Sequence, residues 1–233
     1  GKIGIPEEAF GDDVSPEIKS SVLTAISFFK DCGFGIINVS SKYLDLGPEI
    51  YKIISCAEAS SNLARYDGVK YGTCGKRRQS FDSLISSSRS EGFGDEVKKR
   101  ILFGAHVLSY DNYNDLFMKA QALREDIKNE YKSIFEKCDF VITPTATDTA
   151  YKFTGADINA VQRLKSDKLI ITANLAGLQS VSTPCGYSSD NMPIGLCITG
   201  AEFSDSKVLA AADLFEKEYF APKKKANKFT EVI

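Results

Sequence analysis

The sequence predicts an α/β fold, and three observations carry that prediction. Residues 2–5 form a short apolar strand pattern, an amphipathic helical pattern begins at Pro16, and residues 35–39 form a second strand pattern. A strand, a helix and a strand in succession form a βαβ unit, which favours a parallel pair of strands covered by the helix. Strand and helix patterns keep alternating along the 233 residues, as is typical of α/β proteins.

The first helix is the best marked of the predicted elements. Ser15 is a candidate N-cap and Pro16 stands at the first helical position, where its missing N–H costs nothing. Gly33 marks the end of the helix. Its apolar residues recur at helical spacing and predict the buried face: Ile18, Val22, Ala25, Ile26 and Phe29.

The later elements follow from apolar periodicity and from turn residues. Helices are predicted over residues 49–65, from residue 95 to about 108, over 113–137, over 158–165 and from 205 onwards. Strands are predicted over residues 139–143, 180–183 and 194–199. Residues 66–75 and 144–156 are predicted loops, and the serines at 86–88 are interpreted as loop or cap residues. The small side chains at 57–61 indicate that another segment packs closely against them.

Composition excludes several classes of function. The formal net charge of −2 argues against a strongly basic nucleic-acid groove, and the lysines at 223–225 are interpreted as a solvated tail. No apolar run approaches the roughly 20 residues that span a bilayer. With one histidine, His106, and six dispersed cysteines, a zinc site is not expected, and the cysteines are predicted to be reduced and mostly buried.

Common catalytic motifs are absent from the sequence. It contains no G-x-S-x-G nucleophile turn, no P-loop and no complete G-x-G-x-x-G. The single G-x-G, at Gly92 and Gly94, is interpreted as a tight turn into a helix whose first turn carries Asp95 and Glu96. His106 is interpreted as a structural residue beside an apolar helix face.

Four blocks carry a resemblance to a known family, in order and in spacing. They are AEASSNLARYDGVKYG (57–72), SRSEGFGDEVKKRI (88–101), NLAGL with PCG (174–178 and 184–186) and MPIGLCITG (192–200). Together they resemble the A-subunit family of the glutamyl-tRNA(Gln) amidotransferases, a branch of the amidase signature family. The resemblance implies a mixed open sheet covered by helices on both faces. It also implies that residues 1–233 are the C-terminal half of a single amidase domain.

The resemblance implies hydrolysis of glutamine to glutamate and ammonia, the ammonia then converting Glu-tRNA(Gln) to Gln-tRNA(Gln). The family uses a Ser-cisSer-Lys triad in its N-terminal half, so this chain is expected to hold no catalytic residue and to be inactive alone. The B and C subunits of the amidotransferase are the expected partners, and tRNA is contacted mainly through the B subunit. No cofactor or metal is expected in this polypeptide, whereas ATP and Mg belong to a partner. The implied location is the bacterial cytoplasm, or a mitochondrial matrix or plastid, with no membrane attachment.

By position in the matching blocks, three residues correspond to the family's glutamine site. Arg100 is expected to bind the α-carboxylate, Asp167 the α-ammonium, and Tyr51 to line the same pocket. An arginine suits a carboxylate because its planar fork can donate to both oxygens. Without the resemblance, Arg100 would be interpreted as a solvated helix residue, Asp167 as a helix-end residue and Tyr51 as packing at the edge of the core.

Two other functions stay open at this point. One is an amidase signature hydrolase that acts on a neutral amide, which would need no arginine and aspartate pair. The other is a non-catalytic segment that scaffolds partner subunits.

Overall fold

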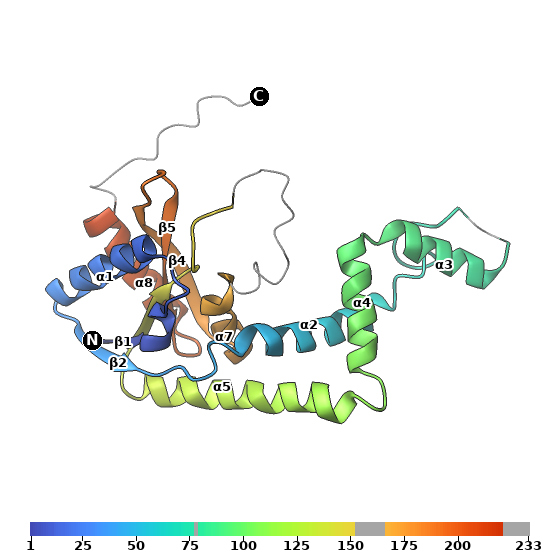
Figure 1. The fold of residues 1–233 in the computed structure, drawn as a ribbon, viewed down its shortest axis with the longest axis horizontal. Helices are drawn as coiled ribbons and strands as arrows, with labels where there is room; N and C mark the ends of the chain where they lie inside the picture. The colour runs from blue at the N-terminus through green and yellow to red at the C-terminus, as the bar shows by residue number, and fades with distance from the viewer. Residues whose placement is uncertain (77–78, 152–165, 221–233) are drawn as a thin grey trace. The chain divides into compact units, whose positions relative to one another are not determined.

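A computed structural model describes residues 1–76, 79–151 and 166–220 (Figure 1). The chain divides into two compact units. One comprises Gly1–Pro48 and Glu125–Ile233, and we call it the sheet unit. The other comprises Glu49–Arg124, and we call it the helical unit.

The sheet unit is built on a five-stranded mixed sheet in the order β2-β1-β3-β5-β4. β1 (Lys2–Pro6) pairs in parallel with both β2 (Gly35–Val39) and β3 (Phe140–Pro144). β5 (Pro193–Gly200) runs antiparallel to β3 and to β4 (Gln179–Tyr187). The predicted parallel pair β1 and β2 and all three later strands are therefore confirmed, with ends that differ by a few residues.

One face of the sheet packs against α1 (Pro16–Asp31) and α8 (Asp205–Phe215). Strand side chains at alternate positions point into this core, and Ile142 of β3 lies opposite Ile198 of β5. Phe29 of α1 stacks on Phe215 of α8 with ring centroids 5.3 Å apart. Burying a side chain of this size contributes about 1.5–3 kcal/mol. All five residues of the predicted α1 face are buried, which confirms its apolar stripe.

The opposite face of the sheet is also covered. Val141, Thr143 and Cys197, which alternate with the first set, are buried as well. The helices on this side are α5 (Lys119–Phe135) and α7 (Lys168–Ala176), joined by a 3.0 Å hydrogen bond between the hydroxyls of Tyr131 and Thr172. Complete burial raises the pKa of Tyr131 to about 12. The α/β class and the helices on both faces are thus as predicted (Figure 1).

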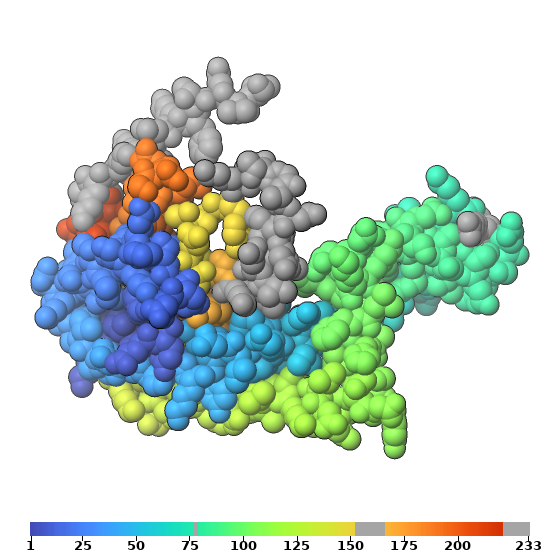
Figure 2. All heavy atoms as spheres, in the orientation of Figure 1, coloured from blue at the N-terminus to red at the C-terminus, as the bar shows by residue number. Residues whose placement is uncertain are grey.

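Short irregular helices complete the sheet unit. They are η1 (Glu7–Phe10), after β1, and η3 (Glu216–Phe220), after α8. Figure 2 shows dark-blue atoms of the N-terminal residues at the surface, beside the lighter-blue residues that follow them. Four of the six cysteines are buried, as predicted, whereas Cys32 and Cys74 are exposed.

The helical unit contains most of α2 (Gly47–Leu63), α3 (Phe81–Gly92), α4 (Asp95–Val107) and the π-helical turn η2 (Tyr113–Met118). α2 and α4 approach each other closely at Gly104. A Cβ on Gly104 would overlap the carbonyl oxygen of Cys56 and crowd Ser60. The close packing predicted for the small residues of α2 is therefore confirmed, and Gly104 is its counterpart.

Helix α3 is a departure from the prediction. The serines at 86–88 lie inside it rather than in a loop, and Ser87 and Ser88 are buried. The helix begins with a reciprocal capping box between Ser80 and Ser83. Ser88 donates to the carbonyl of Leu84 at 2.7 Å, so its hydroxyl is satisfied within the helix. Serine is a weak helix former, which is why the sequence pattern concealed this helix.

The G-x-G segment also differs from its interpretation. Gly92 is the last residue of α3, and Gly94 is the N-cap of α4 with φ −68°. Neither has positive φ, and a Cβ on either would meet nothing. The turn therefore does not depend on glycine, although Asp95 and Glu96 do lie in the first turn of α4 as predicted.

Two predicted helices and one unpredicted helix differ from the sequence pattern in other ways. The helix predicted over 113–137 is present, but its first turn is the π-helical η2. The helix predicted over 158–165 lies outside the described residues. Helix α7 was not predicted, because its sequence reads as an uninterrupted apolar run without a polar face, and most of its side chains are indeed buried.

Candidate functional site: the surroundings of Arg100 and Asp167

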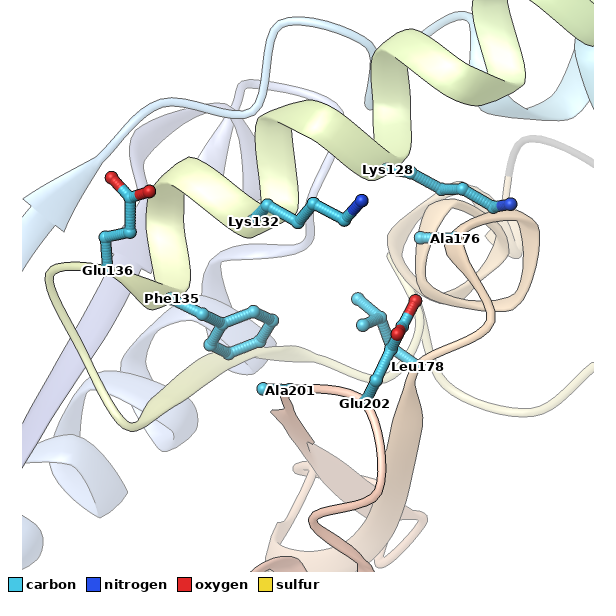
Figure 3. Close-up of a pocket in the computed structure, with 8 residues that line it drawn as sticks. All are labelled: Lys128, Lys132, Phe135, Glu136, Ala176, Leu178, Ala201 and Glu202. Atoms are coloured by element: carbon cyan, nitrogen blue, oxygen red, sulfur yellow. The ribbon is translucent and has the colours of Figure 1, made fainter.

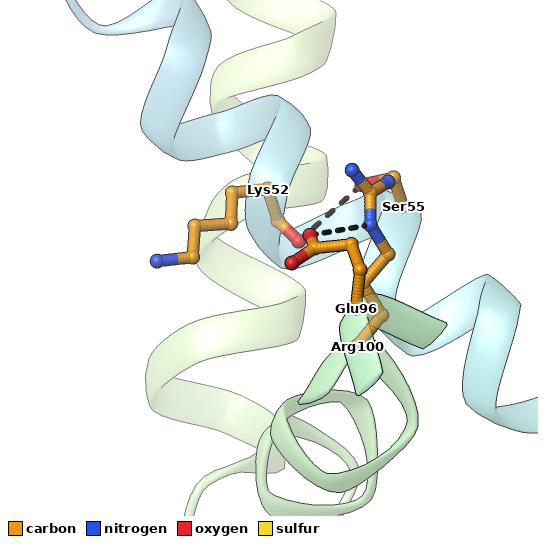
Figure 4. A network of polar contacts seen from close by, with 4 residues as sticks. All are labelled: Lys52, Ser55, Glu96 and Arg100. Carbon is orange, nitrogen blue, oxygen red and sulfur yellow. Dashed lines mark hydrogen bonds and ion pairs between the residues drawn. The ribbon is translucent and has the colours of Figure 1, made fainter. Parts of the chain in front are cut away.

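The structure brings Arg100 and Tyr51 together within the helical unit. Arg100 lies on α4, Tyr51 on α2, and the guanidinium donates a hydrogen bond to the tyrosine hydroxyl. Its Nε also donates to Glu96, one helical turn earlier, at 3.2 Å. Figure 4 shows Glu96 and Arg100 extending from α4 towards α2, with Ser55 beside the guanidinium.

These contacts fix the charge of Arg100. The hydrogen bond to Tyr51, supported by the bond to Glu96, raises the pKa of Arg100 above its ordinary value despite partial burial. A guanidinium carries five N–H donors, and only some of them are used here. Arg100 is thus a permanent cation held in place by two neighbours, with donors left for a carboxylate.

Burial alone does not distinguish Arg100 from the adjacent lysines. The Arg100 side chain is 43% exposed and that of Lys98, which pairs with Asp95, is 40% exposed. Lys98 is thus covered to the same degree as Arg100, whereas Lys99 is exposed. What sets Arg100 apart is its contact with Tyr51 on another helix.

The packed face of α4 differs from the face that the helical spacing of its apolar residues predicts, which comprises Val97, Ile101, Ala105 and Leu108. The buried residues are Gly104 and Val107, whereas Ala105 and His106 are exposed. The His106 ring lies near the amide of Asn112, which also donates to the His106 backbone carbonyl, so His106 does not enter a core. The shift arises because Gly104, which has no apolar side chain, occupies the closest contact with α2.

Asp167 belongs to the sheet unit, where it is the N-cap of α7. Its side chain is exposed and makes no capping hydrogen bond, and no ion pair links it to another described residue. Partial removal from water raises the pKa of its carboxyl. Asp167 thus presents an exposed carboxyl group, in no ion pair with a described residue, to a ligand cation.

The neighbouring Lys168 was not predicted as part of a site. This lysine is only 7% exposed, and its ammonium contacts Asp13 at 2.6 Å and Asp45 at 2.8 Å. Burial lowers its pKa, but the two carboxylates outweigh that effect and raise it. No local pattern signals this cluster, because Lys168 is more than a hundred residues from either carboxylate in the sequence.

Several hollows lie in the sheet unit. One of about 300 Å³ adjoins the start of α7 and is lined by residues that include Ser166, Thr145 and Pro193. Another, of about 280 Å³, lies between the second half of α5, the end of α7 and the turn after β5. Figure 3 shows Lys128 and Lys132 extending from α5 at this second hollow. None of the three predicted site residues lines either of them.

Two further observations concern the described residues. No group of three or more histidine, cysteine, aspartate or glutamate side chains within them could hold a metal ion. None of their helices combines the length and the apolar character needed to cross a membrane.

Known proteins match this chain over most of its length. The A subunit of glutamyl-tRNA(Gln) amidotransferase from Halothermothrix orenii is 41% identical over 216 residues, or 93% of this chain and 45% of that protein. The protein of the same name from Caldanaerobacter subterraneus is 40% identical over 218 residues, or 94% of this chain and 44% of that protein. The chain therefore spans less than half the length of these relatives.

Solved structures share the fold. The crystal structure of the glutamyl-tRNA(Gln) amidotransferase A subunit from Thermotoga maritima superposes with a TM-score of 0.70 at 30% identity, covering 94% of this chain and 42% of that one. A bacterial aryl acylamidase of the amidase signature family superposes equally well at 18% identity, covering 93% of this chain and 43% of that one, which shows the fold alone. Residues 1–209 match the sequence profile of the Amidase family, so the chain belongs to that family and the predicted resemblance is confirmed.

Proposed function

We propose that this chain is part of the glutamine-hydrolysing subunit of a tRNA-dependent amidotransferase. In this proposal glutamine is cleaved to glutamate and ammonia, and the ammonia converts Glu-tRNA(Gln) to Gln-tRNA(Gln) on another subunit. The names of its relatives support the reaction. This chain supplies residues that bind glutamine.

The observation that carries the proposal is the state of Arg100. A site that selects a free amino acid needs a fixed cation for the α-carboxylate. Arg100 meets that need because Tyr51 and Glu96 hold it while donors of its guanidinium stay available. Asp167, whose carboxylate forms no ion pair with a described residue, is the proposed partner of the α-ammonium.

The chemical step and the assembly complete the proposal. The groups that attack the amide are expected outside these 233 residues, so the chain by itself should be inactive. The B and C subunits are the proposed partners, with ATP, Mg and most of the tRNA contact in the B subunit. The proposed compartment is the bacterial cytoplasm or, in a eukaryote, an organelle.

A comparison of two substrates distinguishes the proposed function from that of a hydrolase that acts on neutral amides. The purified protein, assembled with its partners, should hydrolyse glutamine much faster than a fatty or aromatic amide that lacks both charged groups. Preference for the neutral amide would contradict the proposal. Glutaminase activity in residues 1–233 alone would show that the attacking groups lie within this chain.

A further inference from the structure

Two residues of opposite charge, Asp167 and Lys168, are adjacent at the start of α7, but they differ in burial and in ion pairing. Lys168 is almost wholly buried and paired with carboxylates. Asp167, the residue before it, is exposed and has no ion pair with any described residue. Adjacent side chains of opposite charge can reach each other, so their separation needs a cause.

The cause is a pair of carboxylates from two distant segments. Asp13 precedes α1 and Asp45 precedes α2, and both contact the Lys168 ammonium, at 2.6 and 2.8 Å. These distances are those of strong charge-assisted hydrogen bonds. An ammonium has three donors, so the two carboxylates occupy most of its capacity.

The location of this lysine makes the two carboxylates necessary. The N-terminal end of a helix carries a partial positive charge, which disfavours a cation there. Burial adds a further cost, because a buried charge must be paired. An unpaired Lys168 would therefore turn to the nearest free carboxylate, and the preceding residue, Asp167, offers one.

We propose that Asp13 and Asp45 are positioning residues for ligand recognition: they hold the Lys168 ammonium and so leave the Asp167 carboxylate free to bind the ammonium of an amino-acid ligand. This inference rests on the proposed function, in which that ligand is glutamine. The electrostatics of Asp167 agree with it. Desolvation raises the pKa of its carboxyl, and no cation among the described residues opposes that shift.

Binding measurements with two ligands test the inference. One ligand is glutamine, and the other is 5-amino-5-oxopentanoate, which keeps the carboxylate and the amide but lacks the α-ammonium. Calorimetry on the wild-type protein should show tighter binding of glutamine. In an Asp13→Asn/Asp45→Asn double variant the freed lysine pairs with Asp167, so the preference for glutamine should fall about tenfold, the loss expected for one charged contact. The affinity for the analogue should stay unchanged.

A triple variant separates this role from a merely structural one. Adding Lys168→Met to the double variant removes the competing cation, and the preference for glutamine should return. A structural role predicts no recovery, because the triple variant lacks the whole cluster. Loss of preference that persists in the triple variant would overturn the inference, as would a double variant that keeps the wild-type preference. If the double variant does not fold, Asp45→Asn alone should shift the preference in the same direction.

Titration of Asp167 by carbon NMR gives a readout that needs no ligand. The freed ammonium should lower the pKa of the Asp167 carboxyl in the double variant, and the triple variant should restore it. An unchanged pKa in the double variant would overturn the inference whatever the binding data. In a different outcome, the wild-type protein binds the two ligands equally well while the Asp167 pKa still changes in the variants as expected. That result would overturn the role of Asp167 in the proposed function instead.

Discussion

The two units hold their cations in different ways. In the helical unit Arg100 is half exposed, and its ion pair, with Glu96, spans one turn of the same helix. In the sheet unit Lys168 is buried, and its two partners come from segments distant in the sequence. The first arrangement leaves donors for a ligand, whereas the second consumes them.

The two units also differ in how their side chains and backbones pack. The sheet unit surrounds a mixed sheet with apolar side chains on both faces, including the stacked pair Phe29 and Phe215. The helical unit has few fully buried side chains and relies on a close backbone approach at Gly104. The sheet unit is therefore stabilised mainly by buried apolar side chains, whereas the helical unit depends more on close backbone packing. Four predictions test this division.

The largest expected effect is on substrate binding by the helical unit. Arg100→Ala should raise the KM for glutamine about 30-fold or more, because a charged contact to the carboxylate is lost. Lys99→Ala is the matched control, since this neighbouring cation is exposed and no described residue pairs with it in an ion pair. Steady-state glutaminase assays of both variants decide the matter. Equal KM values would remove Arg100 from the site.

The sequence predicted the elements of the sheet unit better than those of the helical unit. The strands, the α1 face and the parallel pair were predicted because their signals are local patterns of apolar residues. Helix α3 was missed, because capping and buried hydroxyls rather than an apolar stripe stabilise it. The packed face of α4 was displaced because its closest contact is made by a glycine.

The site was predictable only where the family motif reached it. Arg100, Tyr51 and Asp167 were assigned by resemblance, and the contact between Arg100 and Tyr51 agrees with that assignment without testing it. The cluster of Lys168, Asp13 and Asp45 depends on the tertiary fold, which no local pattern records.

The next prediction concerns the buried tyrosine of the sheet unit. The pKa of Tyr131 is about 12, above its ordinary value of 10.0, so folding favours the neutral phenol. Stability is therefore complete below pH 10 and falls as the pH rises towards 12, by about 1.4 kcal/mol for each pH unit between these two values. Tyr131→Phe should remove this alkaline loss in urea denaturation at pH 9 and pH 11.5. Tyr110→Phe, at a residue 96% exposed, should leave the loss in place.

Close packing in the helical unit is tested by a single methyl group. Gly104→Ala should lower the free energy of unfolding by about 1–3 kcal/mol, because the added Cβ forces α4 away from the Cys56 carbonyl. Gly92→Ala is the control, since that helical glycine has negative φ and open space, and it should be neutral or slightly stabilising. Equal stability of the two variants in urea denaturation would mean that α2 and α4 are not in close contact.

The smallest effect is expected at the turn that follows β5 in the sheet unit. Phe203 has φ +61° and is 91% exposed. Its left-handed backbone conformation is strained, and the side chain gains little stabilisation from burial. Phe203→Gly relieves the strain but adds freedom to the unfolded chain, and the net gain should be about 0.5 kcal/mol. Phe203→Asn should gain a similar amount, since asparagine tolerates this conformation. A loss of stability in both variants would mean that the exposed ring packs against another part of the protein, and that the sheet unit depends on contacts beyond its two covered faces.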